Sequence, residues 1–236
     1  QGGAYTKATL SNLIIKNATT ALRVDSAWNT IPNAELNNVI ITHSSRVNLY
    51  GGYANITGQN IALGPSGVYG FYALGGNYLF EHCTINNTWN FSSRSGSSIG
   101  LVNFFDDINN NRYTRSIQAI FRNSYVGGNL ASEVALGIDP SETFNVSFEH
   151  SALKIEPNPE AGHYSLTDTV MFKNNEYNMN WGFLSSPWIP QEEWKFIPDS
   201  ASTLFGKAIP TPFTPAFDLG GTVRQQPATI GALERP

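Results

Sequence analysis

The sequence predicts an all-β solenoid, a single-stranded parallel β-helix with an irregular C-terminal cap. Three observations indicate this class: a short motif recurs seven times, apolar residues alternate with other residues around it, and no helical stretch separates the copies. The 21 glycines and 13 prolines suit a chain of strands and turns. A solenoid of 236 residues can bury one large core, so a single domain is expected.

The motif places Asn or His two residues after an apolar residue and three residues before another, as in Leu10-Ser11-Asn12 with Ile15. A copy at residues 58–63 lacks the leading apolar residue. The polar positions are Asn12, Asn38, Asn60, His82, Asn123, His150 and Asn174. Their spacings of 26, 22, 22, 41, 27 and 24 residues are typical of stacked coils. We therefore predict seven to eight coils, a stack roughly 30 to 40 Å long.

The polar column is expected to be a structural ladder. Strands of neighbouring coils lie about 4.8 Å apart, so equivalent residues form columns. At a bend, an Asn side chain can bond its own turn and the Asn of the next coil, which leaves few buried amides unpaired. His82 and His150 keep a ring donor and a ring acceptor there. We therefore favour a structural role for both histidines over a catalytic one.

Coils are predicted over residues 1–178. The expected strands of the first three coils cover residues 8–16, 21–25, 35–42, 47–50, 55–63 and 68–74. After His82, about one extra coil of sequence enters, with a strand near 99–105 and a polar loop at 106–112. Long loops on a regular scaffold often carry binding residues. No amphipathic helix precedes the first strand to cover its edge, so we expect further protein upstream.

Residues 179–236 are predicted to form an irregular layer in the same domain, folded over the end of the stack. The segment combines several prolines with a run of aromatic residues. These are Trp181, Phe183, Trp188, Trp194, Phe196, Phe205, Phe213 and Phe217. An aromatic end cap is the preferred interpretation, and a platform for sugars is the alternative.

The chain ends in a recognisable tail, whose positions are Asp218, Gly221, Arg224, Ile230, Gly231, Ala232 and Glu234. The pattern D-x-x-G-x-x-R followed by I-G-A-x-E resembles the tail of many secreted right-handed β-helix proteins of the pectate-lyase-like superfamily, common in Bacteroidetes and related bacteria. The resemblance implies a right-handed helix, export and a connection with polysaccharides, but no particular reaction. From the residues themselves, we expect Arg224 to pair with Asp218 or Glu234 as the last strand docks.

Composition excludes several function classes. With 14 basic and 18 acidic residues, the net charge is −4, and no basic stripe is present to bind nucleic acid. No apolar run is long enough for a transmembrane segment. Cys83 is the one cysteine, and we expect it to pack between strands. No coil collects three acidic residues, so neither a metal nor a cofactor is expected.

The sequence motifs do not identify catalytic residues. Polygalacturonase-like hydrolases of the resembled superfamily carry paired aspartates with G-H-G and R-x-K motifs, whereas this chain has Asp106 and Asp107 without either companion. Adjacent carboxylates on a strand point to opposite faces, so this pair cannot set a two-carboxylate site. Whether the chain is an enzyme stays open, with a polysaccharide lyase or a glycoside hydrolase as the expected class if it is one.

One lateral strip nevertheless collects groups suited to sugars. Residues about ten to thirteen positions after successive ladder residues are Arg23, Asp25, Asn48, Tyr50 and Tyr72, and the strip continues after the insertion with Asp106 and Asp107. Aromatic faces stack on sugar rings, and charged groups bond their hydroxyls. Ordinary solvent-facing strand residues are the alternative, and a slip of one residue would turn the tyrosines inward.

Two functions therefore remain. The first is a secreted or cell-surface protein that binds polysaccharide or oligosaccharide, either in its own right or as the C-terminal part of a polysaccharide-degrading enzyme. The second is a structural or adhesive surface protein in which the solenoid is a spacer or contact face.

Overall fold

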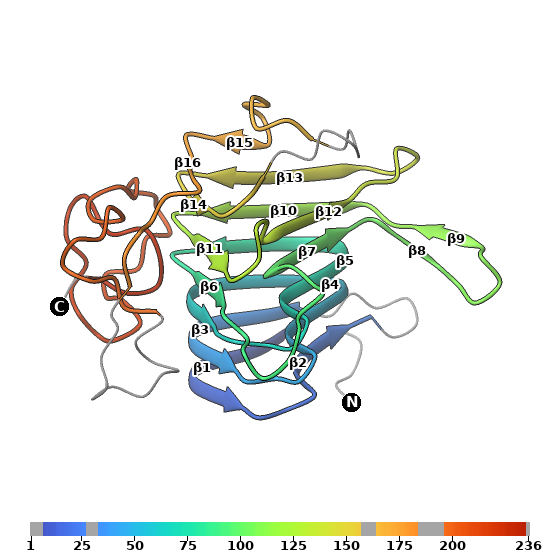
Figure 1. The fold of residues 1–236 in the computed structure, drawn as a ribbon, viewed down its shortest axis with the longest axis horizontal. Helices are drawn as coiled ribbons and strands as arrows, with labels where there is room; N and C mark the ends of the chain where they lie inside the picture. Colours follow the sequence, from blue (N-terminus) through green and yellow to red (C-terminus); the bar gives the residue numbers. More distant parts are fainter. Residues whose placement is uncertain (1–6, 27–32, 157–163, 184–195, 235–236) are drawn as a thin grey trace.

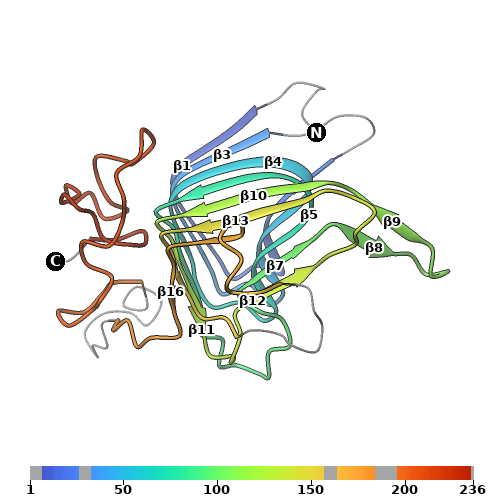
Figure 2. The same ribbon diagram turned by 90° about the horizontal axis from the view of Figure 1, so that it is seen from above.

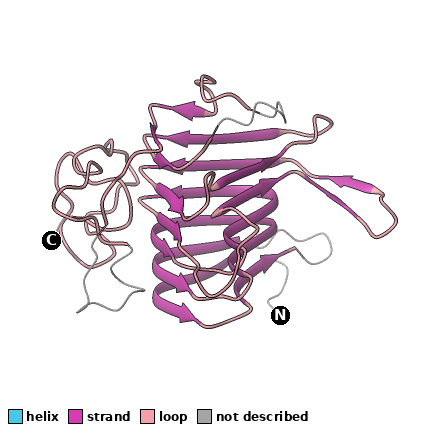
Figure 3. Ribbon diagram, in the orientation of Figure 1, coloured by secondary structure: helices cyan, strands magenta, loops and turns pink. Residues whose placement is uncertain are grey.

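The computed structural model describes residues 7–26, 33–156, 164–183 and 196–234, which form a parallel β-solenoid of the right-handed type (Figure 1). The predicted all-β parallel helix is confirmed, and the described residues contain no helix (Figure 3). The stack has about six turns, fewer than the seven to eight predicted. The difference arises because the seven ladder residues mark seven stacked strands on one face. Going from the first of these strands to the last takes only six complete turns.

The strands run in chain order as follows: β1 Lys7–Lys16, β2 Thr20–Asp25, β3 Asn33–Thr42, β4 Val47–Leu63, β5 Tyr69–Glu81, β6 Thr84–Asn87, β7 Ile99–Val102, β8 Phe104–Asp106, β9 Arg112–Thr114, β10 Ile117–Arg122, β11 Tyr125–Gly128, β12 Val134–Gly137, β13 Phe144–Glu149, β14 Ala152–Leu153, β15 Phe172–Lys173 and β16 Glu176–Tyr177. The long strands β4 and β5 bend around corners, so each contributes to more than one face.

Three sets of parallel pairings build the coils. On the ladder face, β1, β3, β4, β5, β10, β13 and β15 follow one another. On the second face, the end of β4 is followed by β6, β11, β14 and β16. On the third face, β2 is followed by β4, β5, β7 and β12. Figure 2 looks along the stack, and strands of one face superimpose in it.

The corner between the first two faces explains the ladder. All seven ladder residues have positive φ, between 47° and 56°. This left-handed conformation is disfavoured for most side chains and is enriched in Asn and His, which accounts for the residue types in the column. Asn38 donates to Asn12 over 3.1 Å and Asn60 donates to Asn38 over 2.9 Å. Rings continue the column, with Asn123 3.3 Å from His82 Nε2.

A continuous apolar column fills the interior. The Phe80, Phe121, Phe148 and Phe172 rings stack in sequence, with centroids 5.2, 5.2 and 5.7 Å apart. Full burial of one such side chain contributes about 1.5–3 kcal/mol. Cys83 belongs to the same core, and burial raises the pKa of its thiol to about 12. The cysteine therefore packs as a neutral thiol between strands, as the sequence indicated.

The C-terminal segment, residues 196–234, lies along the side of the stack and not across its end, where the sequence analysis had placed it (Figures 1 and 2). The reason is hydrogen bonding at the ladder corner. Asn123 Oδ1 accepts the Ile209 N–H over 3.0 Å, and Asn60 Nδ2 donates to the Phe217 carbonyl over 2.8 Å. The segment thus satisfies polar groups that successive coils present on one line. Trp188 and Trp194 lie outside the described residues.

The tail is held by a buried ion pair. Arg224 donates to Glu234 over 2.9 Å, so Glu234 is the partner among the two expected. Asp218 instead accepts the backbone N–H groups of Thr222 and Glu234, over 2.7 and 2.8 Å. Arg224 also donates to Asn60 Oδ1 over 2.7 Å. The tail is therefore tied directly to the ladder.

Candidate functional site

Tyr50 and Tyr72 form the centre of the candidate site, on the third face of the stack. Arg23 of β2 is in register with Tyr50 of β4, which is in register with Tyr72 of β5. Leu49 and Phe71, the residues before the two tyrosines, are fully buried. Since successive strand residues point to opposite faces, the tyrosine rings point outward.

These side chains line a shallow hollow of about 320 Å³, here called the tyrosine groove. It is formed by Thr20, Arg23, Arg46, Val47, Tyr50, Val68, Tyr69 and Tyr72. The rings of Tyr50 and Tyr72 are nearly parallel, with centroids 5.9 Å apart and an interplanar angle of 13°. The Arg23 guanidinium lies 4.8 Å from the Tyr50 centroid, in range of a cation–π contact. Asp25 accepts a hydrogen bond of 2.9 Å from Arg23 Nε and holds this guanidinium in place.

Tyr69 and Arg46 are groove residues that sequence reasoning missed. The Tyr69 ring is tilted against Tyr72 at 4.9 Å. Both residues lie at or beside the start of a strand, where the chain leaves a corner and strict alternation does not apply. Gly100 follows Tyr72 in the same column, and a Cβ there would lie 2.8 Å from the Tyr72 ring. The absence of a side chain at Gly100 therefore leaves room for the tyrosines.

The groove offers neutral aromatic faces beside a cationic group. Burial raises the pKa of Tyr72 to about 12 and also raises the pKa values of Tyr50 and Tyr69. The three phenols are therefore protonated at neutral pH and can donate hydrogen bonds. The arrangement can pack apolar groups against the ring edges and bond hydroxyl or anionic groups through the phenols and Arg23.

Asp106 and Asp107 lie outside the groove, contrary to the predicted strip. They belong to the β8–β9 hairpin, which projects sideways from the stack (Figure 1). Asp106 accepts two hydrogen bonds from Arg112, over 2.8 and 2.9 Å, and Asp107 accepts the N–H groups of Asn109 and Asn111 over 2.8 Å each. Both carboxylates thus hold the hairpin. The next position of the tyrosine column is Gly100.

Asn48 was also misplaced, because the sequence analysis set it on the solvent side of the strip. Its side chain is fully buried. It donates to the Gly64 carbonyl over 2.9 Å and accepts the Ser44 N–H over 3.3 Å. Asn48 therefore joins two turns inside a corner, where alternation between faces breaks down.

His82 is a fully buried member of the ladder. Burial, aided by the nearby positive charge of Arg224, lowers the pKa of His82 to about 3. The imidazole of His82 is therefore neutral at physiological pH and closed off from solvent. Within the described residues, no three His, Cys, Asp or Glu side chains gather as metal ligands. The same part of the chain holds no helix long and apolar enough to span a membrane.

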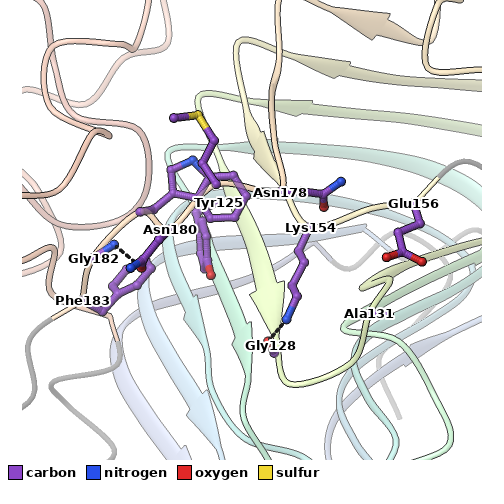
Figure 4. Close-up of a pocket in the computed structure, with 11 residues that line it drawn as sticks. Tyr125, Gly128, Ala131, Lys154, Glu156, Asn178, Asn180, Gly182 and Phe183 are labelled. Atoms are coloured by element: carbon purple, nitrogen blue, oxygen red, sulfur yellow. Dashed lines mark hydrogen bonds between the residues drawn. The ribbon is translucent and has the colours of Figure 1, made fainter.

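A second hollow, of about 270 Å³, lies where β11 and β14 meet residues 179–183 (Figure 4). The rings of Tyr125, Trp181 and Phe183 line it, with centroids 5.3 and 4.7 Å from Tyr125. Lys154 is bound to the Gly128 carbonyl over 2.9 Å. Trp181 and Phe183 belong to the aromatic run that the sequence offered as an alternative platform for sugars, whereas no residue of the predicted strip lines this hollow.

Comparisons with protein-family models, with curated proteins and with solved structures found no match.

Proposed function

We propose that this chain binds polysaccharide and that the tyrosine groove holds the sugar. The observation that carries the proposal is the outward column of Arg23, Tyr50 and Tyr72, one residue from each of three neighbouring coils. The stacked rings of Tyr50 and Tyr72 offer their outer edges as an apolar wall and their phenol groups as donors to a sugar chain. Arg23 and the phenol groups supply donors for hydroxyl groups at the edges.

The side chains of the groove support one another, which favours binding. Asp25 fixes Arg23, and Arg23 in turn lies over Tyr50. Tyr72 is held between Tyr50 and Tyr69. Side chains that are already immobilised lose less conformational entropy when a ligand binds, so more of the contact energy appears as affinity.

Several finer statements belong to the same proposal. A protein that binds polysaccharide acts where such polymers occur, so we place it outside the cell or on the cell surface. The tail pattern around Arg224 supports a relation to secreted β-helix proteins of the pectate-lyase-like type. A role as the C-terminal part of a polysaccharide-degrading enzyme fits the same set of features. A structural or adhesive surface role is the competing function.

A glycan array with the purified chain, followed by calorimetry on the glycans that bind, tests the proposal. Tyr50→Ala and Tyr72→Ala should each weaken binding about tenfold, the effect of losing one well-packed contact. Both variants should keep the melting temperature of the parent. Tyr113→Ala is the matched control, because Tyr113 is 45% exposed and stacks on Phe105 with an angle of 16°, far from the groove. A parent chain that binds no glycan would favour the structural or adhesive role.

A further inference from the structure

An exposed phenylalanine, Phe91, lies beside the half-buried Trp89 on the loop between β6 and β7. The loop covers residues 88–98 and carries Trp89 and Phe91 among polar neighbours such as Asn90 and Ser92. Phe91 is 69% exposed. A ring this exposed contributes little to the core and is free to contact a ligand.

The Phe91 ring is supported from two sides. Its centroid lies 4.8 Å from the Trp89 ring, at an angle of 58°, and 6.0 Å from the His43 ring, at 71°. Trp89 is oriented by a hydrogen bond of 3.0 Å from its indole N–H to Ser92 Oγ. The three side chains of His43, Trp89 and Phe91 form what is here called the loop platform.

A buried ion pair anchors the loop. The side chains of Arg94 and Glu133 are 1% and 0% exposed, and Arg94 Nη1 donates to Glu133 Oε2 over 2.9 Å. Glu133 also accepts the N–H groups of Ser98 and Leu130, over 2.8 and 2.7 Å. Asn129 donates to the Trp89 carbonyl over 2.8 Å. A buried ion pair offsets its desolvation cost only through good geometry and further hydrogen bonds. Here the pair and its hydrogen bonds hold in place a loop that presents aromatic rings.

The loop that carries the platform borders the tyrosine groove. It runs against the groove wall at Gly96, where an added Cβ would lie 2.7 Å from Val68 and 2.9 Å from Tyr69. Val68 and Tyr69 both line the groove. A sugar chain that leaves the groove along this wall can therefore follow the loop toward Phe91.

We propose that the loop platform is an additional sugar subsite of the tyrosine groove, so that the protein binds long polysaccharide chains more tightly than short oligosaccharides. This inference rests on the proposed function. The platform offers ring faces without a carboxylate or guanidinium among its three side chains, which suits the apolar face of a sugar unit. One chain bound to both surfaces gains affinity because the second contact is intramolecular.

The experiment measures affinity against chain length. Size-graded fragments of xylan, mixed-linkage β-glucan and polygalacturonate are titrated into the parent, Phe91→Ala and Phe91→Trp. For the polysaccharide that binds, Phe91→Ala should bind disaccharides and trisaccharides like the parent and octasaccharides about tenfold more weakly. Phe91→Trp should retain the parent's preference for long fragments, because it keeps an aromatic face.

Phe105→Ala is the matched control, since Phe105 is also exposed but lies in the β8–β9 hairpin. If Phe91→Ala binds long fragments as tightly as the parent, the platform is not a subsite, while the groove proposal stands. If Phe91→Ala weakens short and long fragments equally, the platform acts only by shaping the groove, and the inference is wrong. If the parent binds none of the three polysaccharides at any length, the proposed function fails together with this inference.

Discussion

Asn60→Ala is expected to destabilise the fold strongly, because Asn60 joins the ladder to the C-terminal segment. Its amide donates to Asn38 Oδ1 over 2.9 Å and to the Phe217 carbonyl over 2.8 Å, and its Oδ1 accepts from Arg224 over 2.7 Å. Two neutral bonds contribute about 1 kcal/mol each, and the bond to a charged group about 1.5–3 kcal/mol. An alanine at φ 51° adds about 1–2 kcal/mol of strain. The expected loss of unfolding free energy is therefore about 4.5–7 kcal/mol.

Urea unfolding followed by far-ultraviolet circular dichroism measures this loss. Asn60→Gly separates the two contributions, since glycine adopts positive φ freely but makes no side-chain bond. It should be more stable than Asn60→Ala by about 1 kcal/mol and still well below the parent. Asn55→Ala is the control. The Asn55 side chain forms hydrogen bonds with the side chains of Asn33 and Asn77, but on an exposed face where water can replace these bonds. Equal unfolding free energies for Asn60→Ala and Asn55→Ala would refute the stabilising role assigned to the hydrogen bonds of Asn60.

Two further predictions concern buried charge and protonation. His82→Asn should make the protein less sensitive to acid: the folded pKa of His82 is about 3, against about 6.5 in an unfolded chain. At pH values between these two pKa values, the unfolded parent binds a proton that the folded parent does not. The free energy of unfolding of the parent therefore falls by up to about 1.4 kcal/mol for each unit by which the pH is lowered. Urea unfolding from pH 7 to 4 checks this, and identical pH slopes in parent and variant would contradict it. Arg94→Met should cost about 3–5 kcal/mol by leaving Glu133 buried and without its ion-pair partner. Adding Glu133→Gln should restore part of that loss, because it removes the buried charge and keeps an acceptor for the Ser98 and Leu130 N–H groups. Thermal unfolding of both variants decides the point, and a double variant no more stable than Arg94→Met would count against an ion-pair explanation.

The fold could be predicted because one backbone requirement recurs. Each coil turns through a left-handed residue at the same corner, and Asn or His meets that requirement in all seven copies. Parallel stacking then sets the register, so the distance from ladder residue to strip residue is nearly constant. For this reason counting along the chain brought Arg23, Tyr50 and Tyr72 together correctly.

The same counting failed where coils differ. The 41-residue interval after His82 contains both β7, which continues the stack, and the β8–β9 hairpin, which leaves it. Periodicity alone does not tell which of the two follows Tyr72, so Asp106 was placed in the wrong column. Asn48 was misassigned because two successive residues, Asn48 and Leu49, are both buried at a corner.

The position of the C-terminal segment could not be predicted from its composition. Prolines and aromatic residues indicate an irregular layer, but they do not name the surface it covers. That surface is selected by partners distant in sequence, such as Arg224 with Asn60 and the Ala232 N–H with Thr84 Oγ1. The aromatic residues of the loop platform were missed for a similar reason, since the path of their loop depends on the Arg94–Glu133 pair.

Calorimetric titration of the Tyr50→Ala/Tyr72→Ala double variant beside the parent tests the central claim most directly. The titrant is the polysaccharide that binds the parent most tightly on a broad array, and melting temperatures are recorded for both proteins. The tyrosine groove predicts that the parent binds, that the double variant loses at least about a hundredfold in affinity, and that the two melting temperatures agree. A double variant that binds like the parent, or a parent that binds no glycan at all, would contradict it.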